Sequence, residues 1–222
     1  MKGNPISVCI VDDHSVVREG YRRLLERTTD IYVVEEADTG EEAYFRSSRI
    51  RVDVYIMDIN LPGMSGLETL RKIIRRVPDQ KILMFSMHED VVFVSRAMQA
   101  GARGYVTKSS APEVLVDAVR IVASGKLFIS QEMAQELALQ MRPKNKTKLD
   151  LLSAREFEIF RFLVEGYSVS EISELLHLSY KTVANYQSAI KNKLDVSNAA
   201  QIIRVGLEHG VISSQLEDSS SS

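Results

Sequence analysis

The stretch VYIMDINLPG, residues 54–63, decides the fold of this chain, because an apolar run of strand length ends in it on a carboxylate. Val54–Met57 carry no charge, Asp58 follows them, and Pro62-Gly63 turn the chain shortly afterwards. A continuous apolar run bounded by turn residues is typical of a strand buried on both faces. Any polar residue can end such a strand, so Asp58 indicates a functional site only if polar partners follow other strands.

The same pattern recurs along the first half of the chain. Short apolar runs of strand length alternate with longer segments whose apolar residues recur at helical spacing. Because consecutive parallel strands need a crossover connection, usually a helix, the alternation predicts an α/β domain over residues 1–125, with a doubly wound, five-stranded parallel sheet. The expected strands are Ser7–Val11, Tyr32–Glu36, Val52–Met57, Lys81–Phe85 and Gly104–Val106.

Capping-box patterns predict where several helices begin. In this pattern a Ser or Thr and a Glu three residues later satisfy the free backbone amides of the first helical turn. We expect a helix to begin at each of the pairs Thr39/Glu42, Ser65/Glu68, Ser110/Glu113, Ser153/Glu156 and Ser168/Glu171.

The strand pattern ends after Gly125. Residues 126–148 contain one more segment of helical spacing, Ser130–Met141, and then a polar stretch with a single proline, so we expect a helix and a linker there. The chain ends in a serine-rich segment, residues 213–222, which is expected to be disordered. The linker and the tail bound a second domain over residues 149–212.

The second domain shows only helical spacing. A short helix near Ser170–Leu176 and a longer one near Tyr180–Leu194 are separated by three residues. Two helices joined by so tight a turn predict a helix-turn-helix, so we expect a small all-α domain.

Composition limits the classes of protein to consider. The 222 residues suffice for two small domains, and the net charge of −2 means that any nucleic-acid surface must be local. The single cysteine, Cys9, excludes an intrachain disulfide and a cysteine-based metal site, and its apolar neighbours indicate a buried strand in a reducing compartment. The segment before Asp12 contains no long apolar stretch of the kind a signal peptide has, and no later run of about 18 uncharged apolar residues indicates a membrane span. We therefore expect a cytoplasmic protein that does not enter a membrane.

Polar residues follow four of the five predicted strands. Asp12 and Asp13 follow the first strand, Asp58 the third, Ser86 the fourth and Lys108 the fifth. In doubly wound sheets ligands bind beyond the carboxyl ends of the strands. Three carboxylates there would repel one another unless a cation lay among them, which predicts an oxygen-coordinated divalent ion, Mg²⁺. The lysine and the serine supply a positive charge and a hydroxyl suited to phosphoryl oxygens.

Four motifs carry a resemblance to a known family: VDDH (11–14), MDINLPGMSG (57–66), MFSMHED (84–90) and GYVTK (104–108). In order and in placement after successive strands they resemble the receiver domains of bacterial two-component response regulators, which have a flavodoxin-like fold. The resemblance implies that Asp58 attacks a phosphohistidine on a sensor histidine kinase and forms an acyl phosphate.

The resemblance also assigns roles to the surrounding residues. It implies that Mg²⁺ is bound by Asp12, Asp13, Asp58 and the backbone carbonyl of Asn60. Phosphoryl contacts are expected from Ser86 and Lys108, and Tyr105 is expected to rotate inward as Ser86 moves.

The second domain resembles the LuxR-type helix-turn-helix, in the pattern LSAREFEIFRFLVEGYSVSEISELLHLSYKTVANYQSAIKNKL (152–194). Both resemblances together indicate a response regulator of the NarL/FixJ type. They imply a phosphorylation-activated transcription regulator that binds double-stranded DNA and forms a homodimer when phosphorylated.

The segment Tyr180–Leu194 is locally basic in a protein that is not, because it has three lysines and no acidic residue before Asp195. As a recognition helix it would direct one group of side chains to base edges, with Asn185 the best candidate for reading adenine, and another group to phosphates. The expected base-facing residues are Ala184, Asn185 and Ser188, and the expected phosphate-facing residues are Lys181, Thr182, Lys191 and Lys193.

Ala184 stands where the LuxR-type family often has lysine. This substitution removes a strong guanine or phosphate contact, so the affinity of a monomer is expected to be weak and dimerisation to matter. The expected dimer surface lies on the last helix, although core packing explains its apolar residues equally well; the residues are Ile202, Ile203, Val205 and Leu207.

Two other functions compete with this interpretation. A haloacid-dehalogenase-like phosphatase also forms an aspartyl phosphate, but it needs an acidic residue where Asn60 stands, and an amide does not transfer a proton. A receiver whose output is protein binding is the other alternative, and the lysines of Tyr180–Leu194 argue against it. We therefore expect no enzyme activity beyond self-phosphorylation from a phosphodonor and slow self-dephosphorylation.

Overall fold

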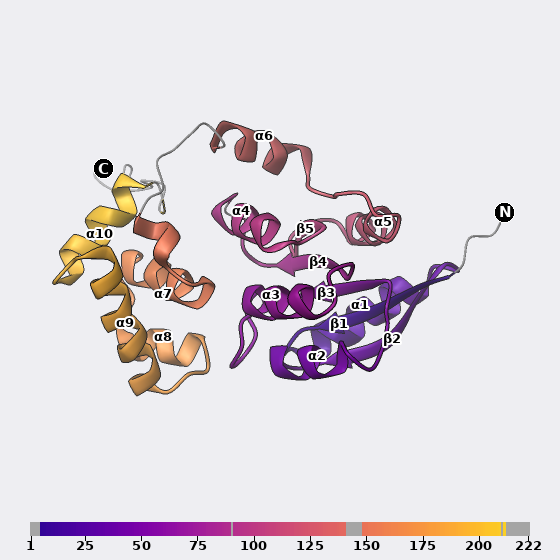
Figure 1. Cartoon of the computed structure of the whole chain (residues 1–222), viewed down its shortest axis with the longest axis horizontal. Coiled ribbons are helices and arrows are strands. Elements are labelled where there is room, and N and C mark those ends of the chain that lie inside the picture. The colour runs from indigo at the N-terminus through magenta and orange to yellow at the C-terminus, as the bar shows by residue number, and fades with distance from the viewer. Residues whose placement is uncertain (1–4, 90, 141–147, 210, 212–222) are drawn as a thin grey trace, which may run out of the picture. The chain divides into compact units, whose positions relative to one another are not determined.

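The computed structural model describes residues 5–89, 91–140, 148–209 and 211. The chain divides into two compact units, residues 1–143 and 144–222, which we call the first and the second unit (Figure 1). Most of the predicted linker and all of the predicted tail lie outside the described residues.

Five parallel strands form the sheet of the first unit, in the order β2-β1-β3-β4-β5. The order reverses between β1 and β3, so the carboxyl ends of these two central strands lie at a topological switch point. The doubly wound parallel sheet predicted from the sequence is confirmed, with ends that differ by one or two residues. The strands are β1 (Ile6–Val11), β2 (Ile31–Ala37), β3 (Val54–Met57), β4 (Lys81–Ser86) and β5 (Gly104–Thr107).

Helices connect and follow these strands, and most begin where the capping pattern predicts. Thr39 and Ser65 each accept a hydrogen bond from the backbone amide three residues on. The expectation for Ser110 is wrong, because Pro112 occupies the first helical position, Ala111 becomes the N-cap, and the Ser110 hydroxyl contacts Thr107 instead. The helices are α1 (Ser15–Glu26), α2 (Gly40–Arg46), α3 (Gly66–Arg76), α4 (Val91–Ala100), α5 (Pro112–Ala123) and α6 (Gln131–Gln140).

Both faces of β1, β3, β4 and β5 are buried, which explains why these strands read as continuous apolar runs, whereas Tyr32 and Val34 of the edge strand β2 are exposed. Side chains alternate between the faces of a strand. Val8 and Ile10 of β1 therefore share one core cluster with Leu25 of α1 and Val119 of α5. Their neighbour Cys9 points to the opposite face and is also buried, as the sequence predicts.

Every secondary-structure element in the described residues of the second unit is a helix, and both predicted capping boxes are present, at Ser153 and Ser168. Gly166 follows the first of its α-helices with a φ of 93°, a conformation that glycine adopts without strain. No helix in the described ranges of either unit is long and apolar enough to span a membrane. The helices are η1 (Lys148–Leu151), α7 (Ala154–Val164), α8 (Val169–Leu175), α9 (Tyr180–Leu194) and α10 (Ala199–Glu208).

Candidate functional site

The sheet ladder holds two aspartates at the carboxyl ends of the central strands. The amide of Asp12 donates to the carbonyl of Ala37 over 3.1 Å, and the amide of Asp58 donates to the carbonyl of Val11 over 2.9 Å. Each of these residues comes directly after its strand, so regular hydrogen bonding continues one position past the strand and fixes the backbone that carries the carboxylate. Both aspartates are buried.

Lys108 joins the two aspartates across the sheet. Its Nζ donates to Oδ2 of Asp12 over 2.5 Å and to Oδ2 of Asp58 over 2.6 Å. Its own amide donates to the carbonyl of Ser86 over 2.8 Å, which places the lysine beside the end of β4. The structure therefore brings together residues that follow β1, β3 and β5, as the sequence predicts for one edge of a parallel sheet.

The charges at this site do not balance. Burial raises the pKa of Asp58, and the Lys108 ammonium opposes this shift without cancelling it. Burial by itself lowers the pKa of Lys108, but the charges of Asp58 and Asp12 outweigh burial, so the pKa of the lysine is raised. One ammonium thus neutralises only part of the charge of two buried carboxylates, and the remaining negative charge can attract a cation.

The residues after β1 fit a hard divalent cation. Oδ1 of Asp13 is buried and accepts no hydrogen bond, although Nδ1 of His14 lies 2.8 Å away. One ligand atom from each of Asp12, Asp13 and His14 lies within 4.8 Å of the others. Asp58 is not part of this group and is connected to it through Lys108. A carboxylate oxygen that accepts no hydrogen bond, beside an excess of negative charge, suits Mg²⁺, which takes oxygen ligands.

His88, a residue that sequence reasoning missed, contacts three of the predicted site residues. Its ring donates from Nε2 to Oδ1 of Asn60 over 3.0 Å. Its backbone amide donates to Oγ of Ser86 over 3.3 Å, and its carbonyl accepts a hydrogen bond from the Tyr105 hydroxyl over 2.8 Å. Tyr105 is fully buried in this arrangement. The only signal in the sequence is that His88 comes two residues after Ser86.

Arg18 of α1 is a second residue that the sequence did not reveal. Its Nη1 donates to the backbone carbonyl of Asp12 over 2.5 Å. The same guanidinium pairs with Glu36 at 3.2 Å and with Asp38 at 2.6 Å, both near the end of β2. Arg18 therefore fixes the carboxyl end of β1 from the side of the neighbouring strand.

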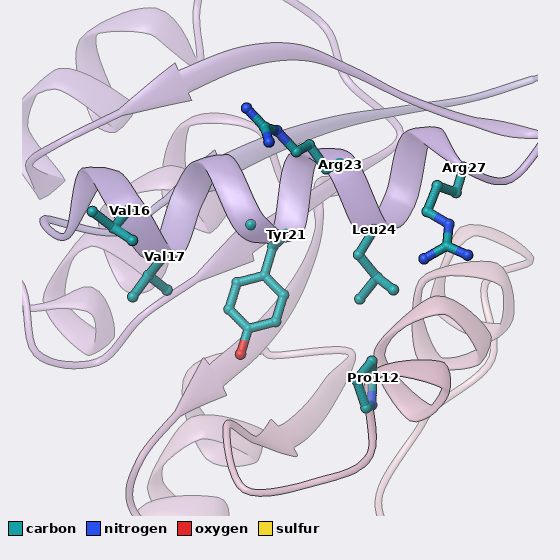
Figure 2. Close-up of a pocket in the computed structure, with 8 residues that line it drawn as sticks. Val16, Val17, Tyr21, Arg23, Leu24, Arg27 and Pro112 are labelled. Carbon is teal, nitrogen blue, oxygen red and sulfur yellow. The ribbon is translucent and has the colours of Figure 1, made fainter.

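An apolar surface pocket of about 470 Å³ lies between α1 and the start of α5 (Figure 2). Val16 in the first turn of α1 is 84% exposed, although it is a large apolar side chain. In Figure 2 the side chains of Tyr21 and Leu24 extend from α1 on the side where Pro112 lies. Its lining residues are Val16, Val17, Gly20, Tyr21, Arg23, Leu24, Arg27 and Pro112.

In the second unit, α9 has one buried and one exposed face. Val183, Ile190 and Leu194 are buried. Lys181, Asn185 and Ser188 are exposed at positions that share a helical face. The other predicted DNA-contacting side chains of this helix, Thr182, Ala184 and Lys191, are partly buried.

Lys193 lies at the carboxyl end of α9 and makes a contact that the sequence did not predict. Its Nζ donates to Oε2 of Glu156 over 2.6 Å. Glu156 is the capping-box glutamate of α7, and the same oxygen accepts from the amide of Ser153 over 2.6 Å. Burial raises the pKa of Glu156, but the bonds from Lys193 and Ser153 outweigh burial and hold that pKa below its ordinary value. The lysine therefore stabilises the packing of α9 on α7.

The predicted dimer residues differ in exposure. Ile202 is buried within the second unit, Ile203 and Val205 are partly buried, and Leu207 is 53% exposed. The helix that carries them packs closely on α7, because a Cβ on Gly206 would lie 2.2 Å from a methyl group of Val164.

Both units match known families. The family model described as "Response regulator receiver domain" matches residues 8–120, and the one described as "Bacterial regulatory proteins, luxR family" matches residues 150–205. These ranges cover the sheet with its flanking helices and the helix-turn-helix.

Relatives and solved structures agree with these matches. The response regulator UvrY of Escherichia coli K12 is 41% identical over 212 residues, covering 95% of this chain and 97% of the relative. The response regulator GacA of Pseudomonas aeruginosa is 38% identical over 209 residues, covering 93% and 98%. RcsB of Salmonella enterica serovar Typhimurium, solved bound to promoter P1flhDC with the phosphomimetic BeF3-, is 26% identical, with a TM-score of 0.62 and coverage of 90% and 98%. The chain therefore belongs to the two-component response regulators that join a receiver domain to a LuxR-family DNA-binding domain.

Proposed function

We propose that Asp58 is the residue whose phosphorylation switches this DNA-binding transcription regulator. The observation that carries the proposal is the Lys108 ammonium, bonded to both Asp12 and Asp58 where β1 and β3 end. A buried carboxylate beside a lysine and further carboxylates has the surroundings of a phosphoryl acceptor. The carboxylate can attack phosphorus, the lysine can contact phosphoryl oxygens, and the other carboxylates can hold a cation.

The chain's own residues prepare Asp58 for transfer. A carboxylate oxygen of Asp58 forms a bond to phosphorus as the bond from phosphorus to the kinase histidine breaks, and the histidine nitrogen keeps that electron pair. Lys108 and the Ser86 hydroxyl would contact the phosphoryl oxygens that gain negative charge. Asp12, Asp13, Asp58 and the Asn60 carbonyl would hold Mg²⁺, which when bound neutralises part of that charge.

Turnover is expected to be slow, so the protein is a regulator and not a phosphatase. Asn60 stands two residues after Asp58, and its side chain bonds to His88. An amide cannot donate or remove a proton as a general acid or base does. Self-phosphorylation by a small phosphodonor and slow self-dephosphorylation are therefore the only reactions we assign to the chain.

DNA contact is assigned to the exposed face of α9. Lys181, Asn185 and Ser188 share this face, and the helix has no acidic residue. RcsB, a similar protein, is described as two dimers bound to two parallel DNAs, which supports a homodimer on DNA here. The apolar residues of α10, led by the exposed Leu207, are the proposed dimer surface. Because its target is DNA, we assign the protein to the cytoplasm.

The experiment that tests this function compares DNA selection before and after phosphorylation. The full chain is incubated with genomic fragments, with and without prior labelling by acetyl phosphate and Mg²⁺, and the retained fragments are sequenced. We expect the labelled protein to retain a defined set of fragments at higher yield. Equal yields of the same fragments in both states would contradict the proposal.

A pair of substitutions on α9 should separate base reading from phosphate contact. Asn185→Ala is expected to reduce the free energy of binding to the selected DNA by about 1–3 kcal/mol and that to random DNA by little. Only the selected DNA contains the base that Asn185 would contact. Lys191→Ala should weaken binding to both DNAs alike. Titration of each variant on both duplexes measures the difference. Equal losses on both DNAs for Asn185→Ala would remove it as a base-reading residue.

Magnesium should stabilise the receiver domain through Asp13. A ligand that binds only the folded state adds about 2.7 kcal/mol to the free energy of unfolding when its concentration is 100 times its Kd. The Tm should therefore rise with added Mg²⁺. Asp13→Asn should reduce this rise, because it replaces a buried, negatively charged oxygen ligand that accepts no hydrogen bond with a neutral amide. Asp79→Asn, at an exposed position, is the matched control. Thermal unfolding in EDTA and in Mg²⁺ gives the comparison, and an unchanged rise in Asp13→Asn would exclude this ligand.

A further inference from the structure

The ring of His88 fixes the loop between β4 and α4 at two places. Its Nε2 donates to Oδ1 of Asn60, which lies in the loop that follows Asp58. Its ring also stacks on Phe93 of α4, with ring centroids 4.0 Å apart and an interplanar angle of 7°. One side chain therefore connects the loop that carries the phosphoacceptor to the helix that follows β4.

The backbone of the same residue carries the contacts to both predicted switch residues. The amide of His88 donates to Oγ of Ser86, and the carbonyl of His88 accepts from the hydroxyl of Tyr105. A displacement of the Ser86 hydroxyl toward a phosphoryl group on Asp58 would remove or redirect the first bond. Because the carbonyl of the same residue accepts the second bond, Tyr105 would be affected by the same movement.

We propose that His88 is a positioning residue that couples the phosphorylation site to Tyr105. The ring holds the loop, and the loop presents its amide and carbonyl to Ser86 and Tyr105. This inference rests on the proposed role of Asp58 as phosphoacceptor. The family resemblance implies only that Tyr105 moves when Ser86 moves. The proposal adds that His88 connects these two residues.

A purely structural role predicts a different result. If the ring only fills space, its removal lowers the stability of the receiver domain in both phosphorylation states equally. The ratio of DNA affinities between those states would then stay the same. The ratio is therefore the quantity to measure, because packing alone does not change it.

The test uses the full chain and a duplex recovered by the selection described above. For each variant the Kd is measured before and after labelling with acetyl phosphate and Mg²⁺, and variants are compared at equal labelled fraction. The unmodified chain is expected to gain about 10-fold in affinity, within the usual range of allosteric coupling. His88→Ala should reduce the gain to about twofold or less. Met87→Ala, an adjacent residue that is 68% exposed, should keep the full gain.

Two further variants isolate the bond to Asn60. His88→Gln keeps an N–H donor on a side chain long enough to reach Oδ1 of Asn60, so it should restore most of the gain that His88→Ala loses. Asn60→Ala removes the acceptor but keeps the backbone carbonyl and the stack of His88 on Phe93, so it should also reduce the gain, by no more than His88→Ala does. In the double variant His88→Ala/Asn60→Ala the two losses should not add, because His88→Ala already removes the bond that Asn60→Ala removes.

The outcomes separate this inference from the function on which it rests. If His88→Ala, or Asn60→Ala where His88→Ala does not fold, keeps the full gain while Asp58 is labelled, the role of His88 is wrong and the proposed function stands. Additive losses in the double variant would also contradict it. If the unmodified chain is not labelled at Asp58, both proposals fail.

Discussion

Asp58→Asn should abolish phosphoryl labelling of the chain. Acetyl phosphate with Mg²⁺ is expected to add one phosphoryl group to the unmodified protein, because Asp58 alone among the described carboxylates both follows β3 and bonds to Lys108. Asparagine has nearly the same shape but no nucleophilic oxygen anion. Intact-mass measurement detects the added group, and Asp79→Asn, at an exposed position, should label like the unmodified chain. Stoichiometric labelling of Asp58→Asn would show that the acceptor lies elsewhere.

The same substitution should raise the free energy of unfolding at neutral pH in the absence of Mg²⁺. Burial raises the pKa of Asp58 in the folded state above its unfolded value, so ionised Asp58 costs stability there. The gain from Asn should be complete above the folded pKa and should vanish below the unfolded pKa, where the carboxyl is protonated in both states. Urea unfolding of both proteins across this pH range, in EDTA, measures it. A gain that increases toward acid pH would contradict the assigned direction.

Gly66→Ala, which adds a single methyl group, should strongly lower the free energy of unfolding of the receiver domain. A Cβ at this position would lie 1.8 Å from the backbone carbonyl oxygen of Asp58 and 3.0 Å from the Cα of Ile59. These are backbone atoms, so no side-chain rotation relieves the clash. We expect a loss of about 3 kcal/mol in the free energy of unfolding. Displacement of the phosphoacceptor should also slow labelling on the order of 100-fold.

Gly20→Ala is the matched control for this effect. A Cβ on Gly20 would meet no atom within 4 Å, and the residue lies inside α1. Alanine there should stabilise the helix by about 0.5–1 kcal/mol, because it loses less conformational entropy than glycine. Chemical unfolding of both variants gives the comparison. Equal stabilities would show that the start of α3 does not press against the phosphoacceptor strand.

The sheet and its charged edge were predictable because they depend on local patterns and chain order. Continuous apolar runs identify strands that are buried on both faces, and the carboxyl ends of parallel strands share one edge. Asp12, Asp58 and Lys108 therefore meet as expected, although about 50 and 96 residues separate the lysine from its two partners. The start of α5 was placed one residue too early, because the effect of Pro112 on the N-cap outweighs the Ser110/Glu113 pattern.

The contacts of His88 and Lys193 could not be predicted in the same way. Each depends on the packing of elements that are distant in the sequence, such as the approach of α9 to the start of α7. Periodicity shows which face of a helix is buried, but it does not show which polar group lies opposite the end of a long side chain. The pairing of Lys193 with the capping-box residue Glu156 therefore cannot be read from the helical spacing of α9 or from the capping-box pattern of α7.

The bond between Lys193 and Glu156 has a consequence for counterions. Each lysine that neutralises a DNA phosphate releases condensed cations, so log K falls with log salt by about 0.9 per contact. An ammonium already neutralised by a carboxylate inside its own domain releases none unless that internal bond breaks. The salt dependence of binding should then reflect Lys181 and Lys191 in each protomer and not all three lysines of α9. Part of the positive charge of this helix is thus used in holding the domain together.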